Sequence, residues 1–334
     1  MDRWLQEHLV CPRDHRALKI DGQTLVCAEG HAYPYVDGIP VMLLYDVQPT
    51  HVAFHETRSR VASGAPADRS RDATLPSEAV DPFVQDAVAG TCGNMYRQMV
   101  RRLIAYPIPE LRLPRGAGQA FLDVGCNWGR WCISAAQKGY TVIGIDPSLD
   151  AIRAARRVAA QLGVPAAYVV ADARHLPFAA GAVDLVFSYS VLQHFDKADA
   201  VRALEEIGRV LKVSGTATIQ MPNTFGLRNL YHQVRRGFRR PTAFEVRYWS
   251  PDDLRRTFER AIGPTRLLVD GYFSLNAQAS DRELLAPGFG AVISSSEHLR
   301  RLSGRFPWLV VVADSLYVTS VRSLAGPPAT ASAE

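Results

Sequence analysis

The alternation of apolar and polar runs from Ala120 onward predicts parallel strands that are separated by helices. Runs such as TVIGI and DLVFSY are apolar throughout, which is typical of strands that helices cover on both faces. We expect strands at 120–124, 141–145, 167–171, 183–188, 216–221, 265–273 and 315–322, and helices at 129–138, 148–162 and 197–212. A further helix begins at Pro251, with Ser250 as its N-cap. The pattern predicts a doubly wound α/β domain with a seven-stranded sheet.

The chain before this domain follows a different pattern. Residues 8–44 alternate short β-rich runs with Pro and Gly, which predicts a small β-rich module within 1–46. Large apolar residues are few from about His55 to Ala79, so we interpret 47–80 as a flexible linker. Apolar residues at helical spacing predict helices over 81–89 and 94–106.

The main domain is expected to extend from 81 to 323. We divide it into N-terminal helices (81–106), a core (120–222), an insertion (223–249), and a C-terminal helix and strands (250–323). The last residues, 324–334, consist largely of Ala, Pro and Gly, and are expected to form a disordered tail.

Composition narrows the class of protein. The chain has 334 residues, of which 47% are hydrophobic and 21% charged, as is usual for a globular protein with a substantial core. The opening residues lack the apolar stretch of a signal peptide and no later run is long enough to span a bilayer, so we expect a cytoplasmic location. A net charge of +5 is a weak field over this length, which disfavours nucleic acid as a partner without excluding it. The sequence does not indicate an oligomeric state.

The stretch FLDVGCNWGRW places a glycine-flanked turn directly after a strand. Gly125 and Gly129 bracket this turn, where positive φ angles and close approach of a ligand favour glycine. Asn127 stands where such turns usually carry another glycine, and asparagine tolerates the left-handed region because its side chain can bond locally. The spacing lacks the third glycine of a GxGxxG site, so a nicotinamide-dependent oxidoreductase is the least favoured function.

Two carboxylates follow the next two strands. Asp146 ends the second strand, where it is suited to accept hydrogen bonds from both hydroxyls of a ribose. Asp172 ends the third strand, where a carboxylate can accept a hydrogen bond from an adenine amino group. Together they indicate a cofactor that has a ribose, an adenine and a positive centre, and that needs no phosphate cradle.

Five segments in order, LDVGCNWG, VIGIDPS, ADARHLPF, VDLVFSYSVLQHF and EEIGRVLKVSGTATIQMPN, resemble those of class I S-adenosylmethionine-dependent methyltransferases of the type 11 kind. The resemblance covers about a third of the chain, and it implies a Rossmann-like fold and S-adenosylmethionine as cofactor. It implies that Asp123, Gly125 and Gly129 approach the methionine part, Asp146 the ribose, and Asp172 with Ala173 the adenine. The full set expected around the cofactor is Asp123, Gly125, Cys126, Asn127, Trp128, Gly129, Asp146, Pro147, Asp172, Ala173, Tyr189 and Tyr96. Arg130 and Trp131 are expected to be surface and packing residues of the helix.

Methyl transfer to a hydroxyl needs alignment of the nucleophile and a base for its proton. His194, just beyond the fourth strand, is the candidate base, with capping of the following helix as the alternative role. The arginines of 228–247, interleaved with Tyr231 and Phe238, are a candidate clamp for an anionic acceptor, although a solvated basic helix explains them too. The favoured function is O-methylation of a small metabolite, a sugar or a lipid-linked precursor.

The N-terminal module carries CPRD and CAEGH followed by YPYVDGIPVML, and it resembles the zinc-ribbon-like activator subunit of tRNA and protein methyltransferases. Cys11, Cys27 and His31 fit such a metal site, and Asp14 stands where a second cysteine belongs. A structural zinc site and a metal-free module held by packing are equal alternatives. The module also keeps two other functions open: RNA base methylation, and non-catalytic activation of a partner protein. The fourth strand ends in SYSV, without the NPPY-like motif of amide-nitrogen methylation, which weighs against RNA bases.

Overall fold

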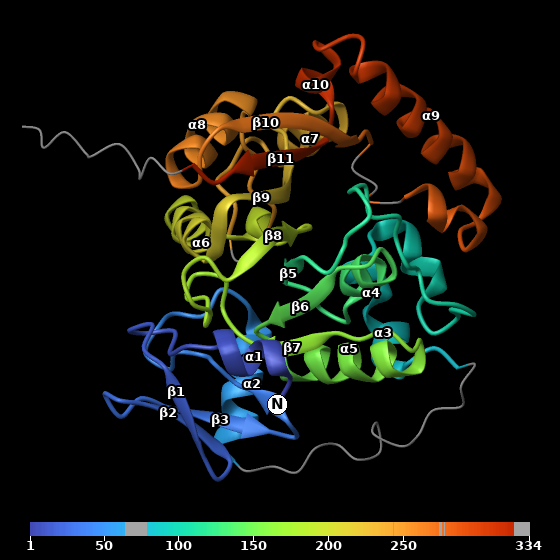
Figure 1. Cartoon of the computed structure of the whole chain (residues 1–334). Helices are drawn as coiled ribbons and strands as arrows, with labels where there is room; N and C mark the ends of the chain where they lie inside the picture. The colour runs from blue at the N-terminus through green and yellow to red at the C-terminus, as the bar shows by residue number, and fades with distance from the viewer. Residues whose placement is uncertain (64–78, 243, 274–275, 277, 324–334) are drawn as a thin grey trace, which may run out of the picture.

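The structure, a computed structural model, describes residues 1–63, 79–242, 244–273, 276 and 278–323. The tail predicted at 324–334 and residues 64–78 of the predicted linker lie outside these ranges. A small N-terminal sheet, blue in Figure 1, lies against one edge of a large twisted sheet that forms the centre of the molecule.

The large sheet confirms the doubly wound α/β prediction. Its strands are β5 (Ala120–Val124), β6 (Thr141–Asp146), β7 (Ala167–Val170), β8 (Val183–Ser188), β9 (Leu211–Pro222), β10 (Thr265–Gly271) and β11 (Ser315–Val321). They lie in the order β10-β11-β9-β8-β5-β6-β7. Strands β5 to β9 run parallel, and β11 pairs antiparallel with both β9 and β10.

Helices cover both faces of this sheet, as the apolar strands required. They include α4 (Arg130–Gln137), α5 (Leu149–Gln161), α6 (Lys197–Val210) and α8 (Pro251–Ala261). Phe121 packs in the cluster that contains buried residues of α4 and α5, whereas Leu122 packs in the cluster of α6 and α8. Neighbouring residues of β5 therefore point to opposite layers of the core.

Side-chain caps fix where these helices begin. The Ser250 hydroxyl accepts the N–H of Asp253 at 3.1 Å, as predicted for the start of α8. Asp196 caps α6 by accepting the N–H of Asp199 at 2.8 Å. The short 3₁₀ helix η2 (Leu192–His194) precedes this cap, so the capping role considered for His194 belongs to Asp196.

Two helix predictions differ from the structure at this point. The helix α3 (Pro82–Thr91) forms as expected, but 94–106 is a 3₁₀ helix, η1 (Asn94–Met99), followed by irregular chain. Positive φ angles at Gly93 (101°) and Arg101 (60°) interrupt the helical path there. The helix predicted to reach 212 ends at Val210, because β9 begins at Leu211.

Part of the predicted linker is a helix, α2 (Val52–Ala62). Its polar residues hold it against the start of α5: the Thr57 hydroxyl donates to the Pro147 carbonyl at 2.9 Å, and Arg60 pairs with Asp150. Because these contacts are polar and few residues of the segment are apolar, the hydrophobic pattern of the sequence did not predict this helix.

The N-terminal module is β-rich, as predicted. It consists of α1 (Arg3–His8) and an antiparallel sheet of β1 (Leu18–Asp21), β2 (Thr24–Cys27), β3 (Ala32–Val36) and β4 (Ile39–Pro40). Directly after β4, Val41 forms a parallel bridge with Val170, and the Met42 N–H donates to the Val170 carbonyl at 2.7 Å. The module therefore continues the large sheet beyond β7 and shares its core.

The C-terminal part adds elements that the sequence pattern did not predict. These are α7 (Leu227–Arg235) within the insertion, η3 (Ala279–Glu283), α9 (Pro287–Ser303) and α10 (Leu309–Val312). In Figure 1, α7, α9 and α10 lie at the end of the molecule opposite the N-terminal module. None of the helices in the described ranges combines the length and the apolar character needed to cross a bilayer.

Candidate functional site

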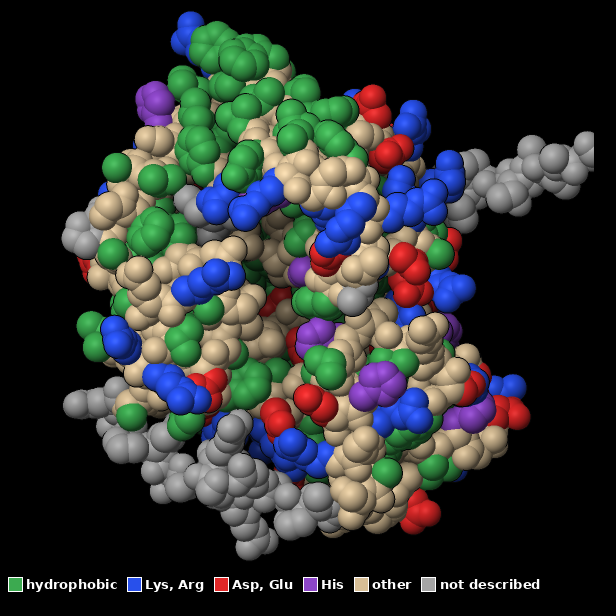
Figure 2. All heavy atoms as spheres, turned by 180° about the vertical axis from the view of Figure 1, so that it is seen from behind, with side chains coloured by type: hydrophobic (Ala, Val, Ile, Leu, Met, Phe, Trp, Pro, Cys, Tyr) green, Lys and Arg blue, Asp and Glu red, His purple; other side chains and the backbone are tan. Residues whose placement is uncertain are grey.

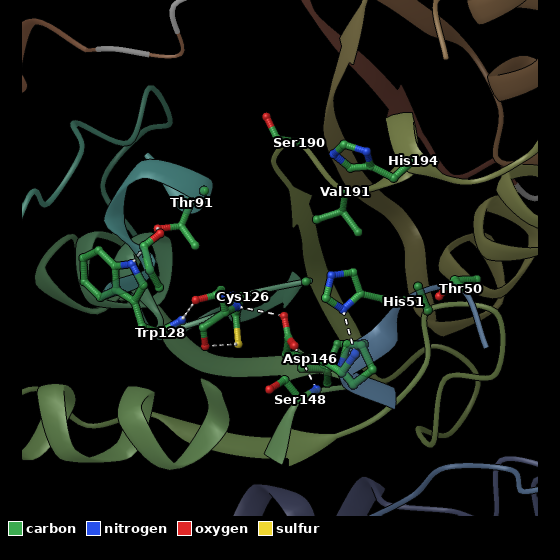
Figure 3. A pocket seen from close by; sticks show the side chains of 18 of the residues that line it. Thr50, His51, Thr91, Cys126, Trp128, Asp146, Ser148, Ser190, Val191 and His194 are labelled. Atoms are coloured by element: carbon green, nitrogen blue, oxygen red, sulfur yellow. Dashed lines mark hydrogen bonds between the residues drawn. The ribbon is translucent and has the colours of Figure 1, made fainter. Parts of the chain in front are cut away.

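A pocket of about 530 Å³ lies at the carboxyl ends of β5, β6, β7 and β8, the edge at which open parallel sheets bind ligands (Figure 3). Residues expected around the cofactor that line it are Gly125, Cys126, Asn127, Trp128, Asp146, Pro147, Asp172, Ala173 and Tyr189. Residues from distant segments complete the wall, among them Thr91 at the end of α3 and His51 before α2. Figure 3 shows Thr91 and Trp128 on one side, His51 and His194 on the other, and Asp146 between them.

The turn after β5 has the conformation that its sequence predicted. Asn127 has a φ of 48°, in the left-handed region, and its side-chain oxygen accepts the N–H of Trp128 at 2.9 Å. Gly125 has a φ of 78°, and a Cβ there would lie 2.3 Å from a methyl group of Val191. Glycine and asparagine at these two positions keep the backbone open to a ligand.

Asp146 presents its carboxylate at the tip of β6. One oxygen accepts the N–H of Asn127 at 3.0 Å and the other accepts the N–H of Ser148 at 2.9 Å. Each oxygen can accept a further hydrogen bond, which suits the paired hydroxyls of a ribose. Burial raises the pKa of Asp146 to about 6, against the lowering effect of the two backbone donors.

Asp172 lies in the pocket wall, but Arg174 holds its carboxylate. The guanidinium approaches to 2.6 Å through Nη2 and 3.1 Å through Nε, and the Arg174 N–H donates at 2.9 Å. An adenine amino group at this position would share the Asp172 oxygens with Arg174. The neighbouring Ala171 and Ala173 give the wall an apolar surface suited to a flat ring.

Three residues expected near the cofactor do not line the pocket. Asp123 is buried beneath the turn, where it accepts a hydrogen bond from the Cys132 thiol at 3.2 Å and burial raises its pKa to about 7. A Cβ on Gly129 would lie 2.9 Å from the Tyr168 hydroxyl oxygen, so this glycine serves the packing of α4. Tyr96 is fully buried in η1.

Arg130 was expected on the helix surface, and the structure contradicts this. Its side chain lines the pocket from the first position of α4 and is only 4% exposed. The nearest carboxylate oxygen, on Asp281, is 3.7 Å from Nη2. Within the described part of the chain, the buried Nε and Nη2 groups have no hydrogen-bond partner. An anionic group bound in the pocket would supply the acceptors that these donors lack.

Aromatic contacts shape the opposite wall of the pocket. The His194 ring stacks on Phe244 with centroids 3.9 Å apart, and His51 meets the same ring edge-on at 4.5 Å. Tyr189 lies in the wall as well, and its hydroxyl donates to Asp270 at 2.8 Å. His51 comes from the predicted linker, whose sequence gave no signal of a site, whereas Phe244 lies within the 228–247 segment that was considered as an acceptor clamp.

Hydrogen bonds assign different tautomers to the two histidines. A carbonyl oxygen can only accept, so His194 Nδ1, 2.9 Å from the Phe244 carbonyl, carries the proton and Nε2 has the lone pair. His51 Nδ1 accepts the N–H of Ala53 at 3.1 Å, which leaves the proton on its Nε2. Burial lowers the pKa of His194 to about 4, so the ring is neutral at physiological pH.

A second pocket of about 810 Å³ adjoins the first. Thr50, His51, His194, Phe195 and Phe244 line both pockets. Arg174, Arg202 and Arg247 contribute to the wall of the second pocket, as do Asp196 and Asp199. His194 therefore lies at the junction between a pocket suited to an adenosine and a pocket of mixed charge.

The four residues predicted to bind metal come together in the N-terminal module. The ligand atoms of Cys11, Asp14, Cys27 and His31 all lie within 4.8 Å of one another. His31 Nδ1 is 3.3 Å from Cys27 Sγ, 3.6 Å from Cys11 Sγ and 3.1 Å from Asp14 Oδ2. Zinc bonds of about 2.0 Å to nitrogen and oxygen and about 2.3 Å to sulfur imply tetrahedron edges of roughly 3.3–3.8 Å. The distances from His31 are close to these edges, and separations of up to 4.8 Å elsewhere in the cluster would have to shorten around a tetrahedral zinc ion.

His15, which follows Asp14 in the sequence, lies outside this cluster. Its Nε2 lies 3.8 Å from the Glu206 carboxylate. The Tyr33 hydroxyl is 3.1 Å from Cys11 Sγ, where it can donate to a thiolate and support a bound metal from outside the ligand set. The backbone N–H of Arg16 lowers the pKa of Asp14 to about 2, which keeps this ligand ionised.

Comparison with known proteins points to the same part of the chain as the first pocket. Residues 121–215 match the model of a methyltransferase domain family. Together with the strand order described above, this match indicates a methyltransferase domain of doubly wound fold within residues 121–215.

Individual relatives are similar over the same core. An uncharacterized methyltransferase of Synechocystis sp. is 34% identical over 111 residues, 33% of this chain and 50% of that protein. The ubiquinone biosynthesis O-methyltransferase of Brucella ovis is 34% identical over 115 residues, 30% of this chain and 46% of that protein. A solved S-adenosylmethionine-dependent methyltransferase of Methanosarcina mazei aligns over 63% of this chain and 95% of its own, with 19% identity and a TM-score of 0.43. The chain spans about half the length of these two curated relatives.

Proposed function

We propose that this protein transfers the methyl group of S-adenosylmethionine to an oxygen atom of a small acceptor. The observation that carries the proposal is the Asp146 carboxylate at the tip of β6, facing a pocket whose floor is the turn at Gly125 and Asn127. The name of the Brucella relative, an O-methyltransferase, supports oxygen as the methylated atom.

In the proposed complex the chain holds each part of the cofactor separately. Asp146 accepts hydrogen bonds from the ribose hydroxyls, and Ala171 and Ala173 contact the adenine ring. Arg130 binds the carboxylate of the methionine part, because its buried donors need an anionic partner. Trp128 closes this end of the pocket, with its indole N–H donating to the Thr91 hydroxyl at 3.1 Å.

S-adenosylmethionine supplies an activated methyl group when it is bound, so the chain's own tasks are to align the acceptor and to take its proton. The Gln193 amide donates to the lone pair of His194 Nε2 at 3.2 Å, and in the proposed complex the acceptor hydroxyl replaces this amide as the donor. A pKa of about 4 suffices, because the hydroxyl becomes strongly acidic as its oxygen gains the methyl group. His51 offers an N–H from the same wall and can hold the acceptor oxygen.

The acceptor occupies the second pocket in this proposal. Arg202 and Arg247 in its wall favour an acceptor with an acidic group. Arg247 is the arginine of 228–247 that lines this pocket. We therefore propose Arg247 as the residue of the expected clamp that contacts the acceptor. A small metabolite, a sugar or a lipid-linked precursor with a hydroxyl and an acidic group fits this description.

The proposal includes a structural zinc ion in the N-terminal module, bound by Cys11, Asp14, Cys27 and His31. The module packs on β7, and the chain that leaves it carries His51 to the pocket. A stable module therefore helps to position one wall of the site. Activation of a partner protein is the second candidate function, which the resemblance of this module to an activator subunit favours.

Isothermal titration with S-adenosylmethionine and S-adenosylhomocysteine tests the cofactor site. We expect both to bind the wild type, and Asp146→Ala to weaken both by about 10- to 100-fold, as expected when hydrogen bonds to a charged group are lost. Glu259→Gln, which removes an exposed carboxylate on α8, is the matched control and should bind like the wild type. Absence of binding to the wild type would overturn the proposal.

Transfer of a labelled methyl group to a cell extract tests the acceptor. The extract is separated after reaction into lipid, small-molecule, RNA and protein fractions, and label in the lipid or small-molecule fraction supports the proposal. Label in RNA would favour RNA base methylation, absence of label would favour activation of a partner protein, and label in protein would overturn the small acceptor. His194→Asn should lower the labelling rate by about 10²- to 10⁴-fold with unchanged cofactor affinity, as expected for loss of a general base.

A further inference from the structure

The helix α7 has its amphipathic faces reversed. Its buried positions are amides: Asn229 donates to the Asp314 carbonyl at 2.7 Å, and Gln233 donates to the Thr224 carbonyl at 2.8 Å. Its exposed positions are apolar, with Tyr231 58% and Val234 57% exposed. A helix on a water-facing surface normally buries its apolar stripe and exposes its polar one. This reversal indicates that the outer face of α7 meets an apolar environment.

Neighbouring segments extend this apolar surface. Trp308, just before α10, and Val311, within α10, are exposed. The Asn223 amide, close to the start of α7, donates to the Val311 carbonyl at 2.7 Å, which holds α10 beside α7. We call the set the α7 face: Phe225, Leu227, Leu230, Tyr231, Val234, Phe238, Trp308 and Val311. Figure 2 shows hydrophobic side chains gathered at this end of the molecule, where Figure 1 places α7 and α10. An exposed apolar surface of this kind marks an interaction site.

Positive charge accompanies the α7 face. The stretch from Thr224 to Phe244 contains five arginines and no Asp or Glu. Of these, Arg235, Arg239 and Arg240 are exposed, and Arg239 pairs with Glu245 at 2.6 Å. An apolar helix face bordered by arginines is complementary to a bilayer with anionic headgroups. Tyr231 and Trp308 have the amphipathic rings that favour the level of the headgroups.

We propose that the α7 face docks the protein on the surface of a membrane that contains anionic lipid. Phe244, nine residues after the end of α7, lines both pockets. Docking through the α7 face would therefore bring the pockets close to the bilayer. An acceptor with an apolar tail can then reach His194 from the membrane, a consequence that rests on the proposed function. The docking itself is independent of methyl transfer.

Vesicle flotation tests the docking with the full-length protein. We expect binding to vesicles of phosphatidylglycerol and phosphatidylcholine in equal parts, and about tenfold less binding to phosphatidylcholine alone. Raised salt should weaken binding to the anionic vesicles, because it screens the arginines. The fluorescence of Trp308 should shift to the blue on binding, a shift that Trp308→Phe removes.

Variants localise the contact. Leu230→Gln/Val234→Gln and Arg235→Gln/Arg240→Gln should each reduce the bound fraction about tenfold. Ile104→Gln is the matched control, since Ile104 is also a highly exposed apolar residue but lies after η1, outside the α7 face. All variants should unfold at the temperature of the wild type, because the substituted side chains are exposed. They should also bind S-adenosylhomocysteine normally, which separates failure of docking from failure of the cofactor site.

Two outcomes would overturn the proposal. One is that the wild type does not float with anionic vesicles, or that Leu230→Gln/Val234→Gln floats equally well. The other is a dimer in sedimentation velocity without lipid that this double variant dissociates, because the α7 face would then be covered by a second copy of the chain.

Discussion

Arg130 shows how much a single residue can reveal about a ligand. A guanidinium that is buried without its full set of acceptors is costly, and the Asp281 oxygen 3.7 Å away compensates only part of the cost. The arrangement becomes favourable when a carboxylate enters the pocket. The residue thus distinguishes a cofactor with an amino-acid part from a plain nucleoside.

The variant Arg130→Met/Asp281→Asn tests this role, and the second substitution avoids an uncompensated buried carboxylate. We expect its affinity for S-adenosylhomocysteine to fall about 10- to 100-fold, as for loss of a hydrogen bond between charged groups. Affinity for 5′-methylthioadenosine, which lacks the carboxylate, should not change. Equal losses for the two ligands in isothermal titration would show that the variant perturbs the pocket as a whole.

The raised pKa of Asp146 predicts a pH dependence of cofactor binding. The ionised carboxylate accepts hydrogen bonds from the ribose, and protonation below a pKa of about 6 removes an acceptor. The dissociation constant of S-adenosylhomocysteine should therefore be constant at neutral pH and rise about tenfold for each unit of pH below the pKa. Titration over this range checks the slope, and Asp146→Asn should abolish it. A slope that persists in Asp146→Asn would assign the pH dependence to another group.

Sequence reasoning succeeded where one residue and its immediate neighbours determine the geometry. The left-handed turn at Asn127 and the position of Asp146 at a strand tip follow from residue type and strand periodicity. It failed for Arg130 and His51, because the burial of Arg130 and the place of His51 in the pocket wall depend on segments far away in the chain. A charged residue at the start of a helix is usually exposed, and nothing adjacent to Arg130 indicates otherwise.

At the scale of elements, the strands of the N-terminal module are short, so its stability depends on contacts that connect its turns. Cys11 precedes β1 and Cys27 ends β2, while Asp14 and His31 lie in the turns around them. A metal ion would connect these turns, and small β modules often need such a connection because their cores are limited.

We expect the purified protein to contain one zinc ion per chain, measured by atomic emission, and Cys27→Ser to contain none. Loss of zinc should lower the Tm by roughly 4 °C, which corresponds to about 3 kcal/mol for a chain of this length. A strong chelator should produce the same change in the wild type and leave the Tm of Cys27→Ser unaltered. A zinc-free wild type with an unchanged Tm would support the metal-free module instead.

Elements were predictable when their apolar periodicity faced the main core. The strands β5 and β8 match their expected ranges, because helices on both faces require apolar residues throughout. The helix α2 was missed because Ala53 and Phe54 are its only buried apolar residues, and a hydrogen bond and an ion pair add to their packing. The reversed helix α7 was missed for the related reason that its apolar residues do not face the core.

At the scale of the molecule, the N-terminal module and the methyltransferase domain form one packed body. Buried residues of the module, such as Cys11 and Leu25, belong to the same hydrophobic cluster as Leu122 of β5. A shared core of this kind couples the stability of both parts.

Calorimetry should therefore show a single unfolding transition for the module and the domain. S-adenosylhomocysteine at about one hundred times its dissociation constant should stabilise the folded state by about 2.7 kcal/mol, and it should raise the Tm of this transition as a whole. Two transitions, of which only one responds to the ligand, would show that the parts unfold independently.

The bridge between Val41 and Val170 also constrains how the chain acquires its structure during synthesis. Its two partners are separated by about 130 residues, which a ribosome adds in roughly 6 to 26 s. For that interval the edge that follows β4 has no strand to pair with, and the apolar residues around Val41 are open to unrelated chains. We expect the nascent protein to need protection by a chaperone until β7 emerges.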